Sequence, residues 1–341
     1  MFLPGTLGRP GQQTLSQEGL ERMAASPDGL RNHSFKRYLT HTGRLIGKNK
    51  EKYVLVLPGL VWFAIFAYIP IFGLTLAFKE YVSKLGLFAS PWIGLENYRN
   101  VFADPAFLQS IFTTLKINAG RLLFVFPFPI LFALMINEIR LGGSKKVLQS
   151  VYTFPYFLSW VIVASIMISV LGQRGLVNAF LGAAFGMKPI SFLGTPSYFL
   201  PVVYVTDNWK SAGWSAIIYM AAISGIDTER YEAAEIDGAS RLQRMWYITL
   251  PGIKPTIFVL FILAVGYLMS GGFDQIFNLS NPATIKVAET LDMYIYRITF
   301  RGSVDFSFSA AVALIRSVVN LLLLFAADRF MKRAGGTGLL A

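Results

Sequence analysis

Long apolar runs separated by short polar segments make up most of the chain, and their length decides the fold class. A helix needs about 20 apolar residues to cross the hydrocarbon core of a bilayer. Six segments meet this length, although Asp207, Asn208 and Lys210 interrupt the fourth. The segments are residues 53–78, 114–138, 147–171, 198–224, 253–273 and 307–329. The pattern predicts an all-α integral membrane protein with six transmembrane helices.

The distribution of Lys and Arg predicts the orientation of these helices. If the N-terminus is cytoplasmic, the inside segments from Arg31 onward hold 17 basic residues and the outside loops hold 9. Cytoplasmic loops of membrane proteins carry the excess of positive charge. Both termini are therefore expected in the cytoplasm. Residues 1–50 form a polar, basic cytoplasmic arm, of which about the first 30 are expected to be disordered. Residues 51–335 form the transmembrane domain, and residues 226–252 form a cytoplasmic loop.

The amino-acid composition excludes several kinds of catalytic and binding site. Hydrophobic residues make up 54% of the chain and charged residues only 15%, as expected for a membrane protein. The chain has no cysteine, and both histidines, His33 and His41, lie in the polar arm. A thiolate nucleophile and a histidine site inside the apolar body are therefore excluded. The net charge of +12 follows from the topology, so nucleic acid is not an expected partner.

The segment EAAEIDGASRLQRMWYITLP, from Glu232 to Pro251, places charged residues between two apolar runs. Asp227 or Thr228 can cap a helix there, and Gly238 permits a left-handed turn after it. Ser240 can cap a second short helix. Residues 226–252 are thus predicted to form a helix–turn–helix elbow parallel to the membrane. Its expected apolar anchors are Tyr231, Ile236, Leu242 and Trp246.

This elbow resembles the signature loop of permease subunits in binding-protein-dependent ABC importers. The family pattern is Glu-Ala-Ala, three residues, Gly, nine residues, then Ile-x-Leu-Pro, and every element is present. The resemblance implies the type I ABC importer permease fold and a cytoplasmic coupling helix that docks into an ATPase subunit. The residues expected to make this coupling are Glu232, Ala233, Ala234, Asp237, Gly238 and Arg241. An ordinary amphipathic linker helix on the bilayer is the alternative.

Three further segments are similar to the carbohydrate-uptake branch of that family, in particular to LplB-type permeases and an alginate importer permease. They are residues 160–166, 208–227 and 273–283. The resemblance implies a non-catalytic subunit of the bacterial inner membrane, paired with a second permease as a heterodimer. Two ATPase subunits, which bind the ATP and Mg, and an extracytoplasmic solute-binding protein are the other implied partners. No cofactor is expected on this chain.

Charged and aromatic residues inside the apolar runs are candidates for the substrate path, because such charges usually face a cavity or a partner. The candidates are Arg121, Asn208, Trp209, Lys210, Trp214 and Arg316. Three cations would favour an acidic saccharide such as alginate. Asp207 and Lys210 are three residues apart on one helical face, so they could pair. The alternative is that the charges form structural pairs and that the tryptophans lie at the membrane interface.

The predicted outer loop 274–306 holds the candidates for contact with the binding protein, Asp274, Asn278 and Asn281. Residues 289–300 are expected to form an amphipathic helix on the membrane surface. A loop that only caps the helix bundle is the alternative.

Two other functional classes compete with an importer subunit. A secondary transporter or channel would account for the intramembrane charges but leaves the elbow without a role, and no inverted repeat is visible. A membrane-embedded glycosyl-transfer enzyme would require clustered carboxylates or histidines, and the only acidic cluster is in the elbow itself.

Overall fold

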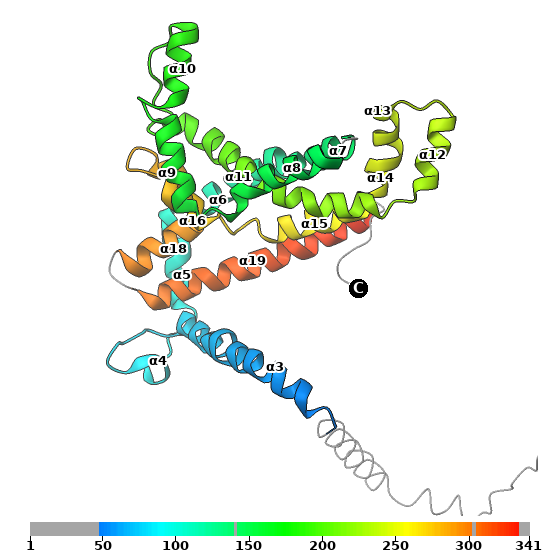
Figure 1. The fold of residues 1–341 in the computed structure, drawn as a ribbon. Coiled ribbons are helices and arrows are strands. Elements are labelled where there is room, and N and C mark those ends of the chain that lie inside the picture. Colours follow the sequence, from blue (N-terminus) through cyan, green and yellow to red (C-terminus); the bar gives the residue numbers. More distant parts are fainter. Residues whose placement is uncertain (1–47, 140–141, 302–304, 334–341) are drawn as a thin grey trace, which may run out of the picture. The chain divides into compact units, whose positions relative to one another are not determined.

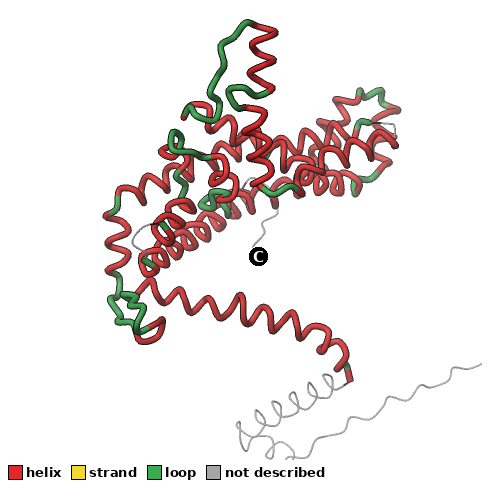
Figure 2. The backbone as a smooth tube through the Cα atoms, turned by 60° about the vertical axis from the view of Figure 1, so that its left-hand side comes forward, coloured by secondary structure: helices red, strands yellow, loops and turns green. Residues whose placement is uncertain are grey.

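The computed structural model describes residues 48–139, 142–301 and 305–333, and this part of the chain is almost entirely helical (Figures 1 and 2). It contains no β-strand within those ranges, only an isolated antiparallel bridge between Lys79 and Trp92. The prediction of an all-α protein is confirmed. The predicted N-terminal arm lies outside the described residues except for its last three positions.

The chain divides into two units, residues 1–72 and residues 73–341. The described part of the first unit consists of α3 (Lys50–Phe63), the π-helix η1 (Ala64–Tyr68) and the start of the 3₁₀-helix η2 (Ile69–Phe78). All residues from Lys50 to Phe72 are exposed, although most are apolar. Such a surface suits lipid or another subunit rather than water.

The second unit contains the remaining helices. Its first half comprises α4 (Gly86–Ala89), α5 (Glu96–Ala103), α6 (Pro105–Gly120), η3 (Arg121–Val125), α7 (Pro127–Asn137), α8 (Gly142–Thr153), η4 (Phe154–Phe157), α9 (Trp160–Leu171) and α10 (Leu176–Phe185). Its second half comprises α11 (Pro196–Ser224), α12 (Thr228–Ile236), α13 (Arg241–Arg244), η5 (Met245–Thr249), α14 (Leu250–Gly252), α15 (Lys254–Gly266), α16 (Phe273–Leu279), α17 (Ile285–Ala288), α18 (Leu291–Phe300) and α19 (Phe306–Arg333).

Four helical stretches among the described residues are long and apolar enough to cross a membrane. They are Lys50–Phe78, Pro105–Asn137, Trp160–Phe185 and Phe306–Arg333. A fifth is obtained if Arg241–Gly252 and Lys254–Gly266, which meet at a 59° bend, count as one span. This is fewer than the six predicted. The predicted fourth span corresponds to α11, a continuous helix of 29 residues that is too polar to meet the same criterion.

Two predicted span boundaries differ from the structure for local reasons. The third run was placed at 147–171, but Pro155 lies in the 3₁₀-helix η4, and the long apolar helix starts only at Trp160. The fifth run was placed at 253–273, but α15 ends at Gly266 and α16 begins at Phe273. Apolar composition continues through both boundaries, so hydropathy alone does not reveal them.

Helix α11 is central to the second unit. It packs against α7, α8 and η4 along its length and reaches α15, α16 and α17. One apolar cluster joins α7, α11 and the start of α15, and it includes Ala133, Tyr219 and Ile253. A second joins α6, α9, α11, α16 and α18 around Ile117 and Val203. The third lies between α5, α6, α18 and α19.

Residues 267–272, here called the break, interrupt the helix between α15 and α16. Because lipid offers no hydrogen bonds, backbone groups freed inside a membrane bundle must be satisfied by the protein. Asn118 Nδ2 donates to the carbonyl oxygens of Leu268, at 2.7 Å, and Ser270, at 3.2 Å. The backbone N–H of Met269 donates to Asn320 Oδ1 at 3.0 Å, and that of Gly271 donates to Asp292 Oδ2 at 2.8 Å. Side chains from α6, α18 and α19 therefore hold the break.

The approach of α11 to α8 gives a test of this packing. A methyl group added at Gly213 would overlap the backbone of Tyr152 and Thr153, which cannot rotate away as a side chain can. Overpacking of this kind costs about 1–3 kcal/mol. We expect Gly213→Ala to lower the thermal unfolding midpoint in detergent by a few degrees. Gly182→Ala is the control, since its added carbon would meet only the Met187 carbonyl oxygen at 3.7 Å. Equal midpoints for both variants would contradict the packing.

Candidate functional site

The elbow, residues 226–252, has the local structure that its sequence predicts. Asp227 caps α12, because its Oδ1 accepts the backbone N–H of Glu229 at 3.0 Å. Gly238 ends the helix in the left-handed region, with φ of +76°. The backbone N–H of Ala239 donates to the Ala234 oxygen at 2.9 Å, and that of Gly238 donates to the Glu235 oxygen at 3.1 Å. This is the hydrogen-bond pattern of a Schellman motif, which favours glycine at that position.

The second arm of the elbow is also capped from within. Ser240 and Gln243 form a reciprocal capping box at the start of α13, as their spacing allows. The helix then continues through η5 and α14 to the bend before α15. Arg244 Nη1 and Glu235 Oε2 form an ion pair at 3.0 Å between the two arms. Tyr231 Oη and Thr249 Oγ1 are hydrogen-bonded at 2.9 Å. The elbow is therefore fixed at its turn and across its arms.

The elbow presents apolar side chains that nothing in the described chain covers. Ile236 is 87% exposed and Tyr247 is 80% exposed, and Leu242 and Trp246 are exposed as well. Of the predicted anchors only Tyr231 is partly buried. Glu232, Ala233, Asp237, Gly238 and Arg241 are exposed, and Ala234 is half-buried. An exposed apolar cluster on a rigid polar loop is typical of a docking surface. Sequence analysis missed Tyr247, which lies beside the predicted anchor Trp246.

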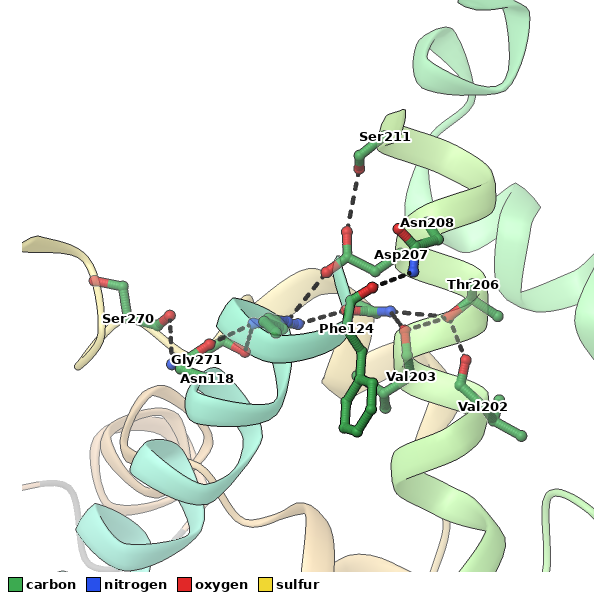
Figure 3. Close-up of polar contacts among 12 residues, drawn as sticks. Asn118, Phe124, Val202, Val203, Thr206, Asp207, Asn208, Ser211, Ser270 and Gly271 are labelled. Carbon is green, nitrogen blue, oxygen red and sulfur yellow. Dashed lines mark hydrogen bonds and ion pairs between the residues drawn. The ribbon is translucent and has the colours of Figure 1, made fainter. Parts of the chain in front are cut away.

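A partly buried arginine, Arg121, connects three segments of the second unit, and Figure 3 labels its partners Asn118, Asp207 and Gly271. Arg121 begins η3, directly after α6. Its Nη1 donates to Asn118 Oδ1 at 2.9 Å and to the Gly271 carbonyl oxygen at 3.0 Å, and its Nη2 donates to Gln275 Oε1. Its Nε lies 3.1 Å from Asp207 Oδ2 in an ion pair, although this N–H is not aligned for a hydrogen bond. The guanidinium group thus joins η3, α11 and the break.

The remaining polar groups around Arg121 are mostly satisfied. Asp207 Oδ1 accepts a hydrogen bond from Ser211 at 3.2 Å. Gln275 Nε2 donates to the Val203 oxygen at 2.8 Å and to Thr206 Oγ1 at 2.9 Å, as Figure 3 shows on the α11 side. Arg121 and Asp207 are each 17% exposed, and removing one partner of such a mostly buried ion pair is destabilising. The network therefore holds α11 against η3 and the break.

This network lines a cavity of about 350 Å³ between α6, η3, α7, α11 and α15, here called the arginine cavity. Arg121 and Asp207 contribute the charges, and they compensate each other. Asn118, Ser211, Ser215 and Ser270 add uncharged polar groups. The rest of the wall is largely apolar, including Phe126, Tyr219 and Leu260. The arginine cavity is therefore polar on one side and electrically neutral.

The ion pair between Asp207 and Lys210 that their spacing allows is not formed. Lys210 is buried, and its Nζ donates to the carbonyl oxygens of Tyr156 at 2.6 Å and Leu158 at 2.7 Å. These oxygens lie at the end of η4, where the helical hydrogen bonds stop. Lys210 therefore caps η4, whereas Asp207 on the same helix pairs with Arg121. The side chains of Asp207 and Lys210 instead each bind a partner that is distant in the sequence.

The other candidate path residues lie in separate places. Arg316 forms an ion pair with Asp292, whose Oδ2 also accepts a hydrogen bond from the Gly271 N–H in the break. Trp214 stacks on Tyr156, with ring centroids 4.7 Å apart. Asn208 and Trp209 line a second cavity of about 310 Å³ beside α7 and α8. Asn208 Nδ2 donates to the Phe124 oxygen at 3.1 Å, in a turn where Pro127 and Pro129 supply no N–H. Only Arg121 of the six lines the arginine cavity.

The residues expected to contact a binding protein are held within the chain. Asn281 Nδ2 donates to the Leu193 oxygen at 2.6 Å, and its Oδ1 accepts the backbone N–H of Ala283 at 3.0 Å. Asn278 Nδ2 donates to the Asp274 oxygen at 2.7 Å. The Asp274 residue is exposed in the first turn of α16. The helix predicted within 289–300 is α18, and its Tyr294 donates to Asp104 Oδ2 at 2.6 Å. Burial, together with this bond, raises the pKa of the Tyr294 phenol above its ordinary value.

Four residues that the sequence analysis missed are central to these contacts: Asn118, Gln275, Asp292 and Asn320. Asn118 and Asn320 lie inside predicted spans, where uncharged polar side chains are a sign of helix–helix hydrogen bonding. That signal was present in the sequence. Gln275 and Asp292 lie in the predicted outer loop and gave no comparable sign.

Comparison with known proteins agrees with this description. Residues 126–335 match the family described as the inner membrane component of binding-protein-dependent transport systems. The polygalacturonan/rhamnogalacturonan transport system permease protein YteP of Bacillus subtilis is 40% identical over 86% of this chain and 91% of its own length. Protein LplB of the same organism is 38% identical over 86% of this chain and 92% of its own length.

A solved structure is similar over nearly the same extent. One chain in the crystal structure of a bacterial alginate ABC transporter, in complex with an alginate pentasaccharide-bound periplasmic protein, superposes with a TM-score of 0.78. It is 36% identical, and the match covers 87% of this chain and 99% of the other. The resemblance inferred from the elbow pattern is confirmed. This chain belongs to the family of inner membrane components of binding-protein-dependent transport systems.

Proposed function

We propose that this chain forms, together with a second permease subunit, the path by which an ATP-driven importer moves an acidic oligo- or polysaccharide across the bacterial inner membrane. The chain itself is a non-catalytic permease subunit. The observation that carries the proposal is the structural and sequence similarity to a chain of the alginate transporter, which covers nearly the whole of that chain. The relative named for polygalacturonan and rhamnogalacturonan supports it, because both polymers contain acidic sugars. Family membership decides against a secondary transporter, a channel or a glycosyl-transfer enzyme.

The remaining subunits follow from this assignment. Two ATPase subunits bind ATP and Mg, and an extracytoplasmic binding protein delivers the saccharide. The complex of the alginate transporter with its saccharide-loaded periplasmic protein supports this arrangement. Asp274 at the start of α16 is exposed and serves as a contact for the binding protein. Asn278 and Asn281 shape the same surface through their bonds within the chain.

In this proposal α11 is the fourth of six spans, and both termini are cytoplasmic. A helix of 29 residues is roughly 43 Å long, which is more than the bilayer core requires. Its polar residues face protein: Thr206 is buried, Asp207 pairs with Arg121, and Lys210 donates to η4. Intramembrane charges that are paired in this way are tolerated. The excess of Lys and Arg then falls on the cytoplasmic side together with the elbow.

The elbow is the coupling helix that docks on an ATPase subunit. Its exposed apolar side chains, led by Ile236 and Tyr247, supply the buried centre of that interface. Glu232, Asp237 and Arg241 supply its charged rim. Figure 1 shows α12 and α13 at one end of α11, and α9 and α10 near its other end.

The arginine cavity is this subunit's share of the translocation path. Its polar groups come from α6, η3, α11 and the break, and the rest of the wall is largely apolar. Arg121, Lys210 and Arg316 all have partners within the chain, so they are not free cations for an acidic saccharide. The acidic substrate is therefore supported by the relatives and not by these three cations.

A substitution that disrupts the turn of the elbow should uncouple ATP hydrolysis from transport. Gly238→Pro removes the N–H that bonds Glu235 and imposes a negative φ where φ is +76°. We expect uptake by the reconstituted importer to fall by about tenfold or more, equivalent to at least ~1.4 kcal/mol, with normal membrane insertion. Gly186→Pro makes the same backbone change at the end of α10, where φ is +62°, and should leave coupling unchanged. Normal uptake by Gly238→Pro would refute the assigned role, as it would for Glu232→Lys.

The apolar centre of the ATPase interface can be tested separately. Burying an isoleucine side chain contributes about 1.5–3 kcal/mol. We expect Ile236→Ala to reduce the ATPase subunit that co-purifies with this chain by about tenfold, because the side chain is covered only in the complex. Leu176→Ala removes a similarly exposed side chain from α10 and is the control. Equal recovery of ATPase with both variants would place the docking surface elsewhere.

The role of the arginine cavity requires stability and uptake to be measured together. Arg121→Gln or Asp207→Asn alone leaves a partly buried charge without its partner, so each single variant should lower the thermal unfolding midpoint. We expect the double variant to recover most of the lost thermal stability but to transport poorly, because the polar side of the path has changed. The double variant Arg297→Gln with Glu289→Gln removes an ion pair that neither lines the cavity nor bonds the break, and it should transport normally. Normal uptake by the Arg121–Asp207 double variant would remove the cavity from the path.

A further inference from the structure

A second polar cavity lies apart from the arginine cavity and from the elbow. It measures about 310 Å³ and lies between α6, the start of α11 and α17. Its hydrogen-bonding side chains are Gln109, Thr113, Lys116, Ser197 and Lys286. We call it the lysine pocket. None of these residues belongs to the elbow or the arginine network, so the pocket has no role in the function proposed so far.

The two lysines of this pocket are solvent-exposed, and they differ from the arginines of the bundle in having no carboxylate partner. Arg121, Arg297 and Arg316 each form an ion pair with a carboxylate of the chain. Neither Lys116 nor Lys286 has an ion pair or a side-chain hydrogen bond with any residue that the structure describes. The pocket itself contains no acidic side chain. Its net charge is therefore positive and uncompensated.

Thr113 gives independent evidence for a ligand. It lines the pocket and is only 5% exposed, yet its hydroxyl has no hydrogen-bond partner in the described chain. The neighbouring Thr114 hydroxyl, in contrast, donates to the Ser110 oxygen at 2.7 Å and accepts the Leu291 N–H at 2.7 Å. Although the residue is buried, its Oγ1 is not shut off from solvent and so opens into the pocket. A hydroxyl that opens into a pocket is available to bond a molecule that enters it.

The start of α11 adds a third feature. The helix begins at Pro196, and its N-cap residue Thr195 makes no side-chain cap bond. Ser197, in the first turn, lines the pocket. The opening turn of a long helix carries unpaired N–H groups and a partial positive charge, both of which favour an anion. The helix end and the two lysines therefore favour the same class of ligand.

We propose that the lysine pocket binds a carboxylate-bearing sugar residue of the saccharide as it enters the permease. The lysines pair with the carboxylate, and Thr113, Ser197 and Gln109 bond the sugar hydroxyls. Phe112 and Leu200, which also line the pocket, provide an apolar surface for the ring. A protein carboxylate would need only the cations, so the mixture of polar and apolar groups favours a sugar. This assignment rests on the proposed function and on its orientation, which puts the start of α11 outside.

The position of the pocket relative to the arginine cavity fits a path. At about 100° per residue, Ser197, Asp207, Ser211 and Ser215 lie within roughly 80° of one another around α11. Ser197 lines the lysine pocket, and the other three line the arginine cavity. At 1.5 Å per residue, Ser197 and Asp207 are roughly 15 Å apart along the helix. Leu200 and Tyr204 lie on the same side between Ser197 and Asp207, so one side of α11 runs from the lysine pocket to the arginine cavity.

The test uses the complete importer in proteoliposomes with its partner permease, ATPases and binding protein. The probes are a labelled oligogalacturonate or alginate oligosaccharide and the same molecule with its carboxyl groups reduced to neutral alcohols. We expect Lys116→Gln and Lys286→Gln each to raise the KM for the acidic probe by about tenfold, the loss of one charge-assisted hydrogen bond. The KM for the neutral probe should not change. Lys116→Arg should keep the acidic KM close to that of the wild type.

Lys188→Gln, which removes an exposed positive charge outside the pocket, is the matched control. An unchanged acidic KM in both pocket variants would overturn the assignment. An equal rise for acidic and neutral probes would also overturn it, because the lysines would then contact the binding protein and not the sugar. If the wild-type importer transports neither acidic oligosaccharide, the proposal of an acidic substrate is wrong. The assignment of the lysine pocket to that substrate is then wrong as well.

Discussion

An interruption of helix inside a membrane bundle is the constraint on which much of this structure depends. Between α15 and α16, backbone groups of the break lose their helical partners in a setting where lipid cannot replace them. Asn118, Arg121, Asp292 and Asn320 supply the missing hydrogen bonds. They come from α6, η3, α18 and α19, so satisfying one short segment determines how four elements meet. Gly272 ends the break in the left-handed region, with φ of +68°, where a side chain would also meet the Arg121 guanidinium group.

The same constraint explains why the charges of the spans are paired. Arg121 and Asp292 bond backbone groups of the break, and each then needs a counter-charge because an unpaired buried ion is very unfavourable. Asp207 and Arg316 provide these counter-charges. Charges that looked like substrate ligands in the sequence therefore support the fold first. Lys116 and Lys286, which have no ion pair among the described residues, lie instead in the lysine pocket beside the start of α11.

The elbow and the bundle differ in how far the sequence could predict them. The Asp227 cap, the Gly238 turn and the Ser240 cap depend on residues within five positions of one another, and all three are found as predicted. The Arg121–Asp207 pair joins residues from different helices, and no local pattern identifies it. Lys210 shows the consequence: its nearest carboxylate in sequence was the expected partner, yet it binds carbonyl oxygens more than fifty residues away. Polar residues in apolar runs indicate that partners exist without saying which ones.

The elbow and the arginine cavity are connected by the helices on either side of the elbow. Helix α11 ends at Ser224, just before α12, and carries Asp207. Helix α15 starts directly after α14 and ends at the break, whose Gly271 accepts from Arg121. Both partners of the buried ion pair are thus held by elements that lead into the elbow. Because the elbow is capped and cross-bridged, a force applied to it moves the ends of α11 and α15 together. The Arg121–Asp207 contact lies where that movement reaches the wall of the cavity, so opening or closing the cavity must either preserve this ion pair or pass through its rupture.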